Sequence, residues 1–439
     1  MTRGSLDSSA DLGLALGAAV LALTCAASST RAPLVAADPA VAAAVEPSPE
    51  AQASAPPAVS ASAATADAIE PLPPPAAGST PNPARGARLD GFRAALAELG
   101  RNARTAPVVV LWLGDSHTHA DFWPHALRAP LQARYGKGGP GFVSLGIKPY
   151  RHSLVSVKVD GKWRREPTNP AASARFKDGV FGLSGQRAIP LGADSVARVT
   201  LLDGAASGRM RFTLLHRTPS GAKFTLELSG DKPRTISGTA QSDIERVELQ
   251  GDARSTLTVT GVRGEPELFG LIVESVEPGV VVDTVGINGA RAATALAWDA
   301  QSFAAQVRAR APSLVVVAYG TNEAASTLAA ARYRAHLSGL VGRIAEAVPG
   351  VDCVLVGPTD MALPDGTSVP RVAELDQVVE SVAAESGCAY FSAARAMGGP
   401  GGFTTWMTKS PPLAAQDRVH LTARGYDALG RAMSAALGL

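Results

Sequence analysis

The sequence carries almost no net charge for its length. Its 439 residues include 41 Lys or Arg and 39 Asp or Glu, which leaves a formal net charge of +2. Proteins that bind nucleic acid or anionic lipid by electrostatic attraction concentrate far more positive charge than this. We therefore expect no nucleic-acid partner and no electrostatic binding to a membrane surface.

Cysteine is also scarce, with 3 residues in the whole chain. Cys353 and Cys388 each lie in an apolar run that predicts a late strand, and the two strands should be neighbours. In an exported protein such a pair could form a disulfide. Two buried free thiols are equally consistent with the pattern, so the sequence leaves both alternatives open.

The apolar segment near the N-terminus is short for a membrane-spanning helix. Residues 12–23 are apolar but fall short of the roughly 20 residues that a span needs, and they fit the apolar part of a secretory signal. Residues 1–25 are therefore predicted to direct export to the periplasm or cell envelope. Leu21-Ala-Leu-Thr-Cys25 resembles a lipoprotein cleavage site, although Thr24 stands where a smaller residue is usual. Lipidation of Cys25 would anchor the N-terminus to a membrane; an ordinary signal peptide or an uncleaved anchor is the alternative.

Aromatic residues are absent from residues 26–86, which are rich in Ala, Pro and Ser. Such a segment cannot bury enough apolar surface to offset the entropy lost on ordering. We predict a disordered, partly extended tether. It would suit an enzyme that reaches from a membrane or wall into a polymer, and it would equally suit a passive spacer.

Two blocks of the chain, 87–152 and 278–439, alternate apolar runs with helical patterns. Strands are predicted at 108–113, 280–287, 312–319, 353–357 and 388–391, and helices at 89–99, 122–135, 290–311, 328–347, 372–385 and 423–437. Fully apolar strands separated by helices indicate a parallel sheet that is covered on both faces. These blocks therefore predict an α/β domain.

Residues 153–277 have a different pattern of apolar and polar residues. Short runs that alternate apolar and polar residues recur at 197–202, 210–215, 223–228, 244–249 and 255–260, separated by Gly, Ser, Asp and Pro. Period-two alternation is typical of antiparallel strands with one face in solvent. The segment predicts a β-sandwich or jelly roll inserted into the α/β domain.

Polar residues follow the predicted parallel strands. Ser116 follows the first strand, Gly289 the second and Asn322 the third, while Asp417 and His420 share a loop before the last helix. Ligands gather at the carboxyl ends of strands in open α/β folds, so we expect these residues to meet there.

This set of residues has the composition of a serine hydrolase site. A serine hydroxyl becomes an effective nucleophile when a histidine takes its proton, and an acid fixes the tautomer of that histidine. Ser116, His420 and Asp417 fit these roles. The N–H groups of Ser116 and Gly289 and the amide of Asn322 could stabilise the oxyanion. Such chemistry requires no cofactor.

The order of the blocks resembles the SGNH, or GDSL-like, hydrolase superfamily. The matching blocks are Gly-Asp-Ser116, Gly289 in Gly-Ile-Asn-Gly, Asn322 in Gly-Thr-Asn-Glu, and Asp417-Arg-Val-His420. The resemblance covers about residues 106–439, allowing for the insert, and implies a three-layer, flavodoxin-like fold. His117 replaces the family's usual Leu and Glu323 its usual Asp. Neither position carries the core chemistry.

A closer resemblance is to the bacterial peptidoglycan O-acetylesterases. It rests on Gly-Asp-Ser-His-Thr-His119, Gly-Gly-Pro-Gly-Phe142, Ala396-Met-Gly-Gly-Pro400 with Trp406, and His-Leu-Thr-Ala-Arg-Gly-Tyr426. That group carries a jelly roll, similar to carbohydrate-binding modules, between the serine and glycine blocks, where the insert lies here. The resemblance implies an O-acetylesterase whose partner is an acetylated glycan polymer, above all peptidoglycan.

Other interpretations of the same residues stay open. His117 and His119 could hold a metal ion with Asp121, although no further ligand cluster accompanies them, or they could line the acyl pocket or make loop contacts. Trp163 and Trp406 could stack on sugars or pack in the interior. The alternative functions are a lipase or thioesterase, an acetylesterase for another polysaccharide, or a non-catalytic glycan-binding protein. We expect a monomer.

Overall fold

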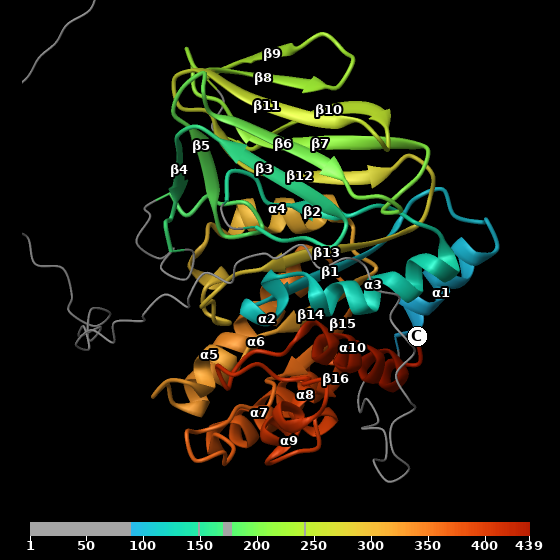
Figure 1. The fold of residues 1–439 in the computed structure, drawn as a ribbon, viewed down its shortest axis with the longest axis vertical. Coiled ribbons are helices and arrows are strands. Elements are labelled where there is room, and N and C mark those ends of the chain that lie inside the picture. The colour runs from blue at the N-terminus through green and yellow to red at the C-terminus, as the bar shows by residue number, and fades with distance from the viewer. Residues whose placement is uncertain (1–88, 148–149, 170–177, 241–242) are drawn as a thin grey trace, which may run out of the picture. The chain divides into compact units, whose positions relative to one another are not determined.

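The computed structural model describes residues 89–147, 150–169, 178–240 and 243–439, so the predicted export signal and tether lie outside the described residues. The described part contains one parallel sheet flanked by helices and two antiparallel sheets (Figure 1). Within these ranges, no helix combines the length and the apolar composition that crossing a bilayer requires.

The parallel sheet, sheet A, has five strands in the order β13-β1-β14-β15-β16. Their bounds are Val108–Gly114 for β1, Val280–Gly286 for β13, Leu314–Ala318 for β14, Asp352–Gly357 for β15 and Ala389–Ser392 for β16. By sequence this is the flavodoxin-like order. Successive side chains point to opposite faces, so Leu111 and Leu113 pack on one side of the sheet and Val110 and Trp112 on the other. Both faces are buried, and β1 is therefore apolar throughout.

Helices cover both faces of sheet A (Figure 1). On one face lie α1 (Asp90–Gly100), α3 (Phe122–Tyr135) and α10 (Ala423–Leu437), and on the other α4 (Ala300–Arg310), α6 (Ala330–Ala347) and α7 (Pro370–Ser386). Short helices follow the strand ends: α2 (Ser116–His119), α5 (Thr321–Ala324), α8 (Ala393–Ala396), α9 (Gly402–Thr408) and the 3-10 helix η2 (Ala295–Ala297).

The helix predicted over 290–311 is wrong in its first half. Residues 290–299 form turns and η2, and α4 begins at Ala300 because the Asp299 carboxylate accepts the Ser302 N–H at 2.7 Å. Before that cap in the chain, the Ala292 N–H donates a hydrogen bond to the side chain of Glu323 in α5. A helical pattern in the sequence cannot show such a distant acceptor.

The insert forms two antiparallel sheets, and β2, which precedes the insert in the chain, adds to one of them. Sheet B has the order β10-β7-β12-β5-β4, with β2 also paired to β12, and sheet C has the order β3-β6-β11-β8-β9. Their bounds are Gly141–Val143 for β2, Val155–Asp160 for β3, Trp163–Glu166 for β4, Arg187–Pro190 for β5, Val196–Leu201 for β6, Arg209–Arg217 for β7, Lys223–Leu228 for β8, Arg234–Ser237 for β9, Glu245–Asp252 for β10, Thr256–Arg263 for β11 and Glu267–Ser275 for β12. The five alternating runs correspond to β6, β7, β8, β10 and β11.

Within sheet B the central strand β12 is covered on both faces, whereas the edge strand β10 keeps the predicted alternation of a half-exposed strand. Leu271 and Val273 of β12 pack inside the sandwich, whereas Phe269 and Ile272 pack with Phe303 of α4 in the core of the α/β part. The pattern of β12 is therefore nearly continuous burial. Sheet C keeps the alternation of a sheet with one solvent face.

A buried salt-bridge network, called the ionic joint below, links the α/β part to the sandwich. Arg310, at the end of α4, pairs with Asp283 of β13 and with Glu274 of β12, each at 2.6 Å. The second oxygen of Asp283 accepts the N–H of Phe142 in β2 at 2.8 Å. The α/β part and the sandwich thus share both an apolar core and a set of charges.

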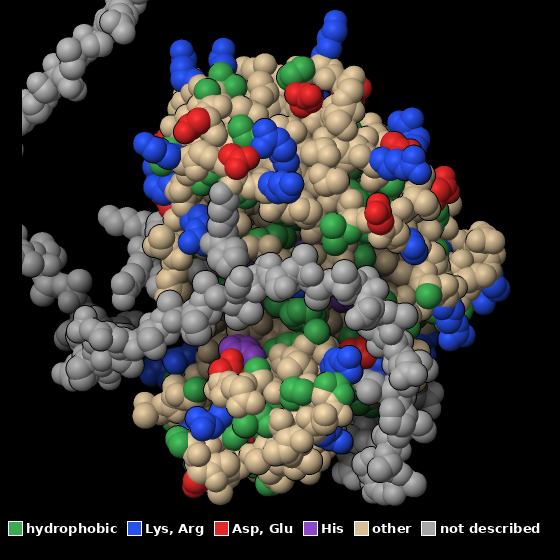
Figure 2. Space-filling model, viewed as in Figure 1, with side chains coloured by type: hydrophobic (Ala, Val, Ile, Leu, Met, Phe, Trp, Pro, Cys, Tyr) green, Lys and Arg blue, Asp and Glu red, His purple; other side chains and the backbone are tan. Residues whose placement is uncertain are grey.

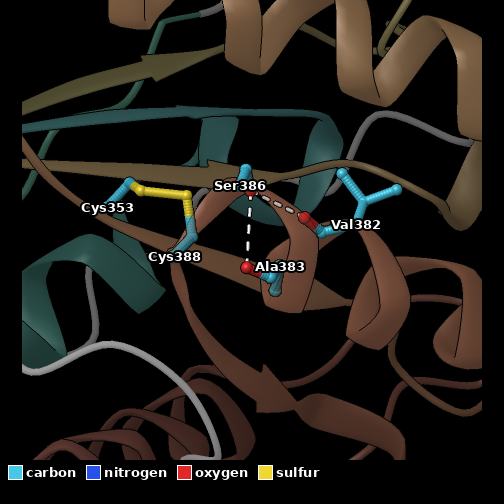
Figure 3. Close-up of a disulfide and its surroundings, with 5 residues drawn as sticks. All are labelled: Cys353, Val382, Ala383, Ser386 and Cys388. Atoms are coloured by element: carbon cyan, nitrogen blue, oxygen red, sulfur yellow. Dashed lines mark hydrogen bonds between the residues drawn. A yellow bond between two sulfur atoms is a disulfide. The ribbon is translucent and has the colours of Figure 1, made fainter. Parts of the chain in front are cut away.

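Cys353 and Cys388 form a disulfide, one of the two alternatives that the sequence leaves open (Figure 3). Cys353 lies in β15 and Cys388 directly precedes β16, the neighbouring strand. The Cα atoms are 4.8 Å apart, so the two strands need no distortion to be bridged.

We expect the peptides that contain Cys353 and Cys388 to resist alkylation in denatured protein and to react fully after reduction, as measured by mass spectrometry. Replacing both cysteines with alanine should lower the free energy of unfolding by about 2–4 kcal/mol, because the bridge restricts the unfolded chain. Labelling of both thiols without reductant would contradict the bridge.

Candidate active site

Ser116 lies in a sharp connection between β1 and α2. A β-carbon on Gly114 would lie 2.1 Å from the Thr118 hydroxyl, so the close return of the chain requires glycine. Asp115 then caps α2, because its carboxylate accepts the His117 N–H at 3.0 Å. Burial raises the pKa of Asp115 to about 6. The turn places Ser116 in the first turn of a helix, where backbone N–H groups have no acceptor within the helix.

The register of sheet A brings three of the predicted site segments to one edge. Gly114 at the end of β1 pairs with Gly286 of β13 on one side and with Ala318 of β14 on the other. Ser116, Gly289 and Asn322 follow these three residues within a few positions.

Ser116, His420 and Asp417 form a hydrogen-bonded chain. The Ser116 Oγ lies 2.9 Å from the His420 Nε2, and the His420 Nδ1 lies 2.7 Å from the Asp417 Oδ2. The other Asp417 oxygen accepts the N–H groups of Val419 and His420 at 3.0 and 2.8 Å. The carboxylate is thus fixed by its own loop before it binds the imidazole.

Asp417 and His420 each stabilise the charged form of the other. The hydrogen bond from His420 holds the pKa of Asp417 well below its usual range, and the bond to Asp417 raises the pKa of His420 above its usual value. A carboxylate can only accept, so the neutral ring carries its proton on Nδ1 and presents the Nε2 lone pair to Ser116. This arrangement can remove the serine proton.

Asn322 and Gly289 lie on adjoining segments. The Asn322 side-chain amide, on α5, donates one hydrogen bond to the carbonyl of Ala290 at 2.9 Å. Gly289 has a φ of 75°, which favours glycine. The asparagine is therefore tied directly to the turn that carries Gly289.

Glu323 contributes to this turn in a way that sequence reasoning missed. Its side chain is buried, and its Oε1 accepts the Ala292 N–H at 2.8 Å. Burial raises the pKa of Glu323 to about 7. Asn322 and Glu323 together hold both ends of the 290–292 segment. The sequence signal that could have found it is an acidic residue that follows Asn322, a few positions after the fully apolar strand β14.

The ring of His117 packs against the ring of His420, the histidine that is hydrogen-bonded to Ser116. Its Nδ1 lies 2.9 Å from the Tyr426 hydroxyl and its Nε2 3.2 Å from the Thr359 hydroxyl, and its ring centroid is 5.2 Å from that of His420. Burial lowers the pKa of His117 to about 3, so this ring is neutral and places no positive charge beside His420. The loop-contact interpretation therefore describes His117.

The other two residues of the possible metal set have separate partners. The His119 Nδ1 lies 2.9 Å from the Gly286 carbonyl. The Asp121 carboxylate accepts from Arg128 at 2.8 and 3.0 Å and from the Thr284 hydroxyl. Across the described ranges, no group of three or more His, Cys, Asp or Glu side chains is arranged to hold a metal ion.

The two tryptophans differ in environment. Trp406 is buried in the core beside α10. Trp163 is half-buried, packs against the sandwich interior and donates its indole N–H to the Asp160 carbonyl at 2.8 Å. Packing in the interior, rather than an open stacking surface, describes Trp406.

A cleft of about 420 Å³ lies between the serine helix and the sandwich. Its walls include His119 of α2, Asn288 beside Gly289, and Arg165 of β4. One wall of this cleft is therefore the helix that carries Ser116, and another is a strand of the sandwich.

Comparison with known proteins agrees with this geometry. The sequence matches the GDSL-like Lipase/Acylhydrolase family over residues 251–428, a range that contains Gly289, Asn322, Asp417 and His420. The match begins inside the insert, and the insert separates it from Ser116. No curated protein matches the sequence.

Several solved structures are similar. A peptidoglycan O-acetylesterase matches over 79% of this chain and 95% of its own, with a TM-score of 0.67 and 24% identity. A putative GDSL-like lipase from Parabacteroides merdae matches over 37% of this chain and 74% of its own, with 15% identity and a TM-score of 0.30. The acetyl xylan esterase AlAXEase matches over 36% and 81%, with 15% identity and a TM-score of 0.28.

The first of these similarities covers more of the chain than the two α/β blocks contain, so it extends into the insert. It confirms the predicted fold, a parallel α/β sheet with an inserted antiparallel sandwich. Residues 251–428 therefore match the GDSL-like lipase/acylhydrolase family, and this match together with the fold supports an SGNH-type ester hydrolase.

Proposed function

We propose that this ester hydrolase removes O-acetyl groups from a polysaccharide of the cell envelope, with peptidoglycan as the foremost substrate. The hydrogen-bonded chain from Ser116 through His420 to Asp417 carries the proposal for the reaction. The similarity to a peptidoglycan O-acetylesterase, which includes the sandwich, supports the substrate class.

In the proposed reaction Ser116 attacks the acetyl carbonyl while His420 takes its proton on Nε2. Asp417 keeps the Nδ1 proton in place and stabilises the imidazolium. The N–H groups of Ser116 and Gly289 and the Asn322 amide stabilise the oxyanion. His420 then gives its proton to the departing sugar oxygen, and water, activated by His420, releases acetate from the acetyl-serine. None of these steps calls for a cofactor.

Several polar side chains of the cleft can form hydrogen bonds with a sugar. Ser144, Arg165, Gln186 and Asn288 all line it, whereas a long acyl chain needs a continuous apolar groove. The exposed large apolar side chains of the described surface are Leu191, Leu202, Val262 and Leu363. On the face shown in Figure 2, acidic and basic side chains are interspersed.

Acetate release tests the proposal directly. The purified protein should release acetate from O-acetylated peptidoglycan and should hydrolyse long-chain acyl esters poorly. Preference for the long-chain ester would favour the lipase or thioesterase alternative, and binding of glycan without any ester hydrolysis would favour a non-catalytic module.

Replacing Asn322 with alanine should lower kcat by about 10²–10³-fold if the amide donates to the oxyanion. Part of any loss could come from the turn, because the amide also binds the Ala290 carbonyl. Glu323→Gln, which keeps an oxygen for the Ala292 N–H, serves as the control for the turn and should retain most activity. Near-normal kcat in the Asn322 variant would remove it from the reaction.

The rate should rise with pH through the titration of His420, since only the neutral ring can act as a base. Its pKa is raised by Asp417, so the rise in kcat/KM should be centred above the ordinary value of 6.5. Asp417→Asn removes the carboxylate, which should shift the midpoint down and lower the rate by about 10⁴-fold. A profile that stays flat from mildly acidic to neutral pH would contradict the role of His420.

Export belongs to the same proposal and rests on the N-terminal sequence alone. We expect the mature protein in the envelope fraction, released from membranes by detergent if Cys25 is lipidated. A Cys25→Ala variant that fractionates identically would exclude the lipid anchor.

A further inference from the structure

The cleft beside the serine helix has a one-sided charge. Arg151 and Arg165 contribute guanidinium groups, and none of the described residues that line the cleft is an Asp or Glu. Ser144, Thr168 and Asn288 add uncharged polar groups. This composition contrasts with the chain as a whole, in which positive and negative charges nearly cancel.

Arg165 is the cation of this cleft that remains unpaired. Alternation along β4 places Arg164 and Glu166 on one face and Arg165 on the other. Arg164 pairs with Glu166 at 2.7 Å and with Glu265 at 2.7 Å. By contrast, the Arg165 side chain has no hydrogen-bond or ion-pair partner among the described residues, and it faces the cleft.

Arg151 supplies a second, fixed positive charge. Its guanidinium carbon lies 3.6 Å from the centre of the Phe122 ring, and the group donates to the Ala120 carbonyl at 2.5 Å and the Ser153 hydroxyl at 3.3 Å. A guanidinium held in this way loses little freedom when it meets an anion.

His119 connects the cleft to the serine. It lies on the same short helix as Ser116 and lines the cleft. The Gly286 carbonyl can only accept, so the neutral ring keeps its proton on Nδ1 and its Nε2 is an acceptor. Burial lowers the pKa of His119, which favours this neutral form. The ring can accept a hydrogen bond from a sugar hydroxyl.

We infer that this cleft is a subsite for an acetylated glycan unit that bears a carboxylate, with Arg165 as the residue that binds the acid. The inference rests on the proposed deacetylase function and adds a charge requirement to it. Guanidinium groups bind carboxylates through paired, charge-assisted hydrogen bonds. The acid would lie on the sugar held next to Ser116 or on a peptide attached to it.

Arg165→Gln tests the inference, with Arg234→Gln as a matched control. Arg234 lies exposed on β9, at the outer edge of sheet C, so the control makes the same charge change away from the cleft. Acetate release would be measured on O-acetylated polygalacturonate before and after reduction of its carboxylates, and on O-acetylated muropeptides before and after amidation. 4-Nitrophenyl acetate reports the chemical step alone.

We expect the unmodified enzyme to prefer the carboxylate form by about 10-fold or more in kcat/KM in at least one pair. The pair that shows the preference identifies whether the sugar or the peptide supplies the acid. Arg165→Gln should lose this preference and keep its rate on 4-nitrophenyl acetate, and Arg234→Gln should match the unmodified enzyme.

Equal rates on both forms in both pairs would overturn the charged subsite while leaving the deacetylase function intact. So would an Arg165→Gln variant that loses activity equally on every substrate, because that result indicates a structural role. Hydrolysis of 4-nitrophenyl acetate with no acetate release from either polymer would overturn the proposed function and the subsite together.

Discussion

The Ser116→Ala variant should lose ester hydrolysis by about 10⁶-fold in kcat, because no other group in the hydrogen-bonded chain can form the acyl intermediate. The fold should be unaffected. Ser116 is half-buried, and its hydroxyl binds His420, itself partly exposed to water. Circular dichroism and urea unfolding should therefore match the unmodified protein within about 0.5 kcal/mol.

Two further variants make this result specific. Ser237 lies on the exposed edge strand β9, away from the site. Ser237→Ala removes a serine hydroxyl there and should leave the rate unchanged. The double variant of Ser116 and His420 should be about as slow as either single variant, because residues that act as one unit are not additive. Activity above about one tenth of normal in Ser116→Ala would rule out Ser116 as the nucleophile.

Much of the α/β part could be predicted because its physical pattern is local. Val110 and Trp112 face one helix layer and Leu111 and Leu113 the other, so the strand must be apolar at every position. Ser116, Gly289 and Asn322 followed from the same logic, since polar residues close after such strands lie at one sheet edge, whereas Asp417 and His420 were recognised by their spacing in one loop before the last helix.

The parts that escaped prediction depend on partners far apart in the sequence. Glu323 holds the Ala292 N–H, and His117 is held by Tyr426 and Thr359. Neither the histidine nor the glutamate shows its partner in any local pattern. The same is true of β2, whose Phe142 pairs with Ile272 of a strand more than a hundred residues later.

The insert is more deeply joined to the catalytic part than its alternating pattern suggests. Phe269 and Ile272 belong to the core that also contains Phe303 of α4. Replacing residues 153–277 with a linker would remove these side chains and expose the apolar surface beneath them. The role of the sandwich in recognition is therefore better tested by single substitutions in the cleft.

Arg310→Met should destabilise the protein by about 3–5 kcal/mol, because it leaves the carboxylates of Asp283 and Glu274 buried without their cation. All three side chains are nearly or fully buried, and Arg310 binds both acids at 2.6 Å. The loss should appear in urea unfolding as a lower midpoint.

Two controls separate this effect from the loss of an ordinary ion pair. Arg198→Met breaks an exposed pair with Asp160 and should cost less than about 1 kcal/mol. Adding Asp283→Asn and Glu274→Gln to Arg310→Met should recover part of the stability, because no buried charge then remains. The amide introduced by Asp283→Asn still offers an oxygen to the Phe142 N–H. If Arg310→Met unfolds like Arg198→Met, the joint is not a determinant of stability, and the two parts are held together by the shared apolar core alone.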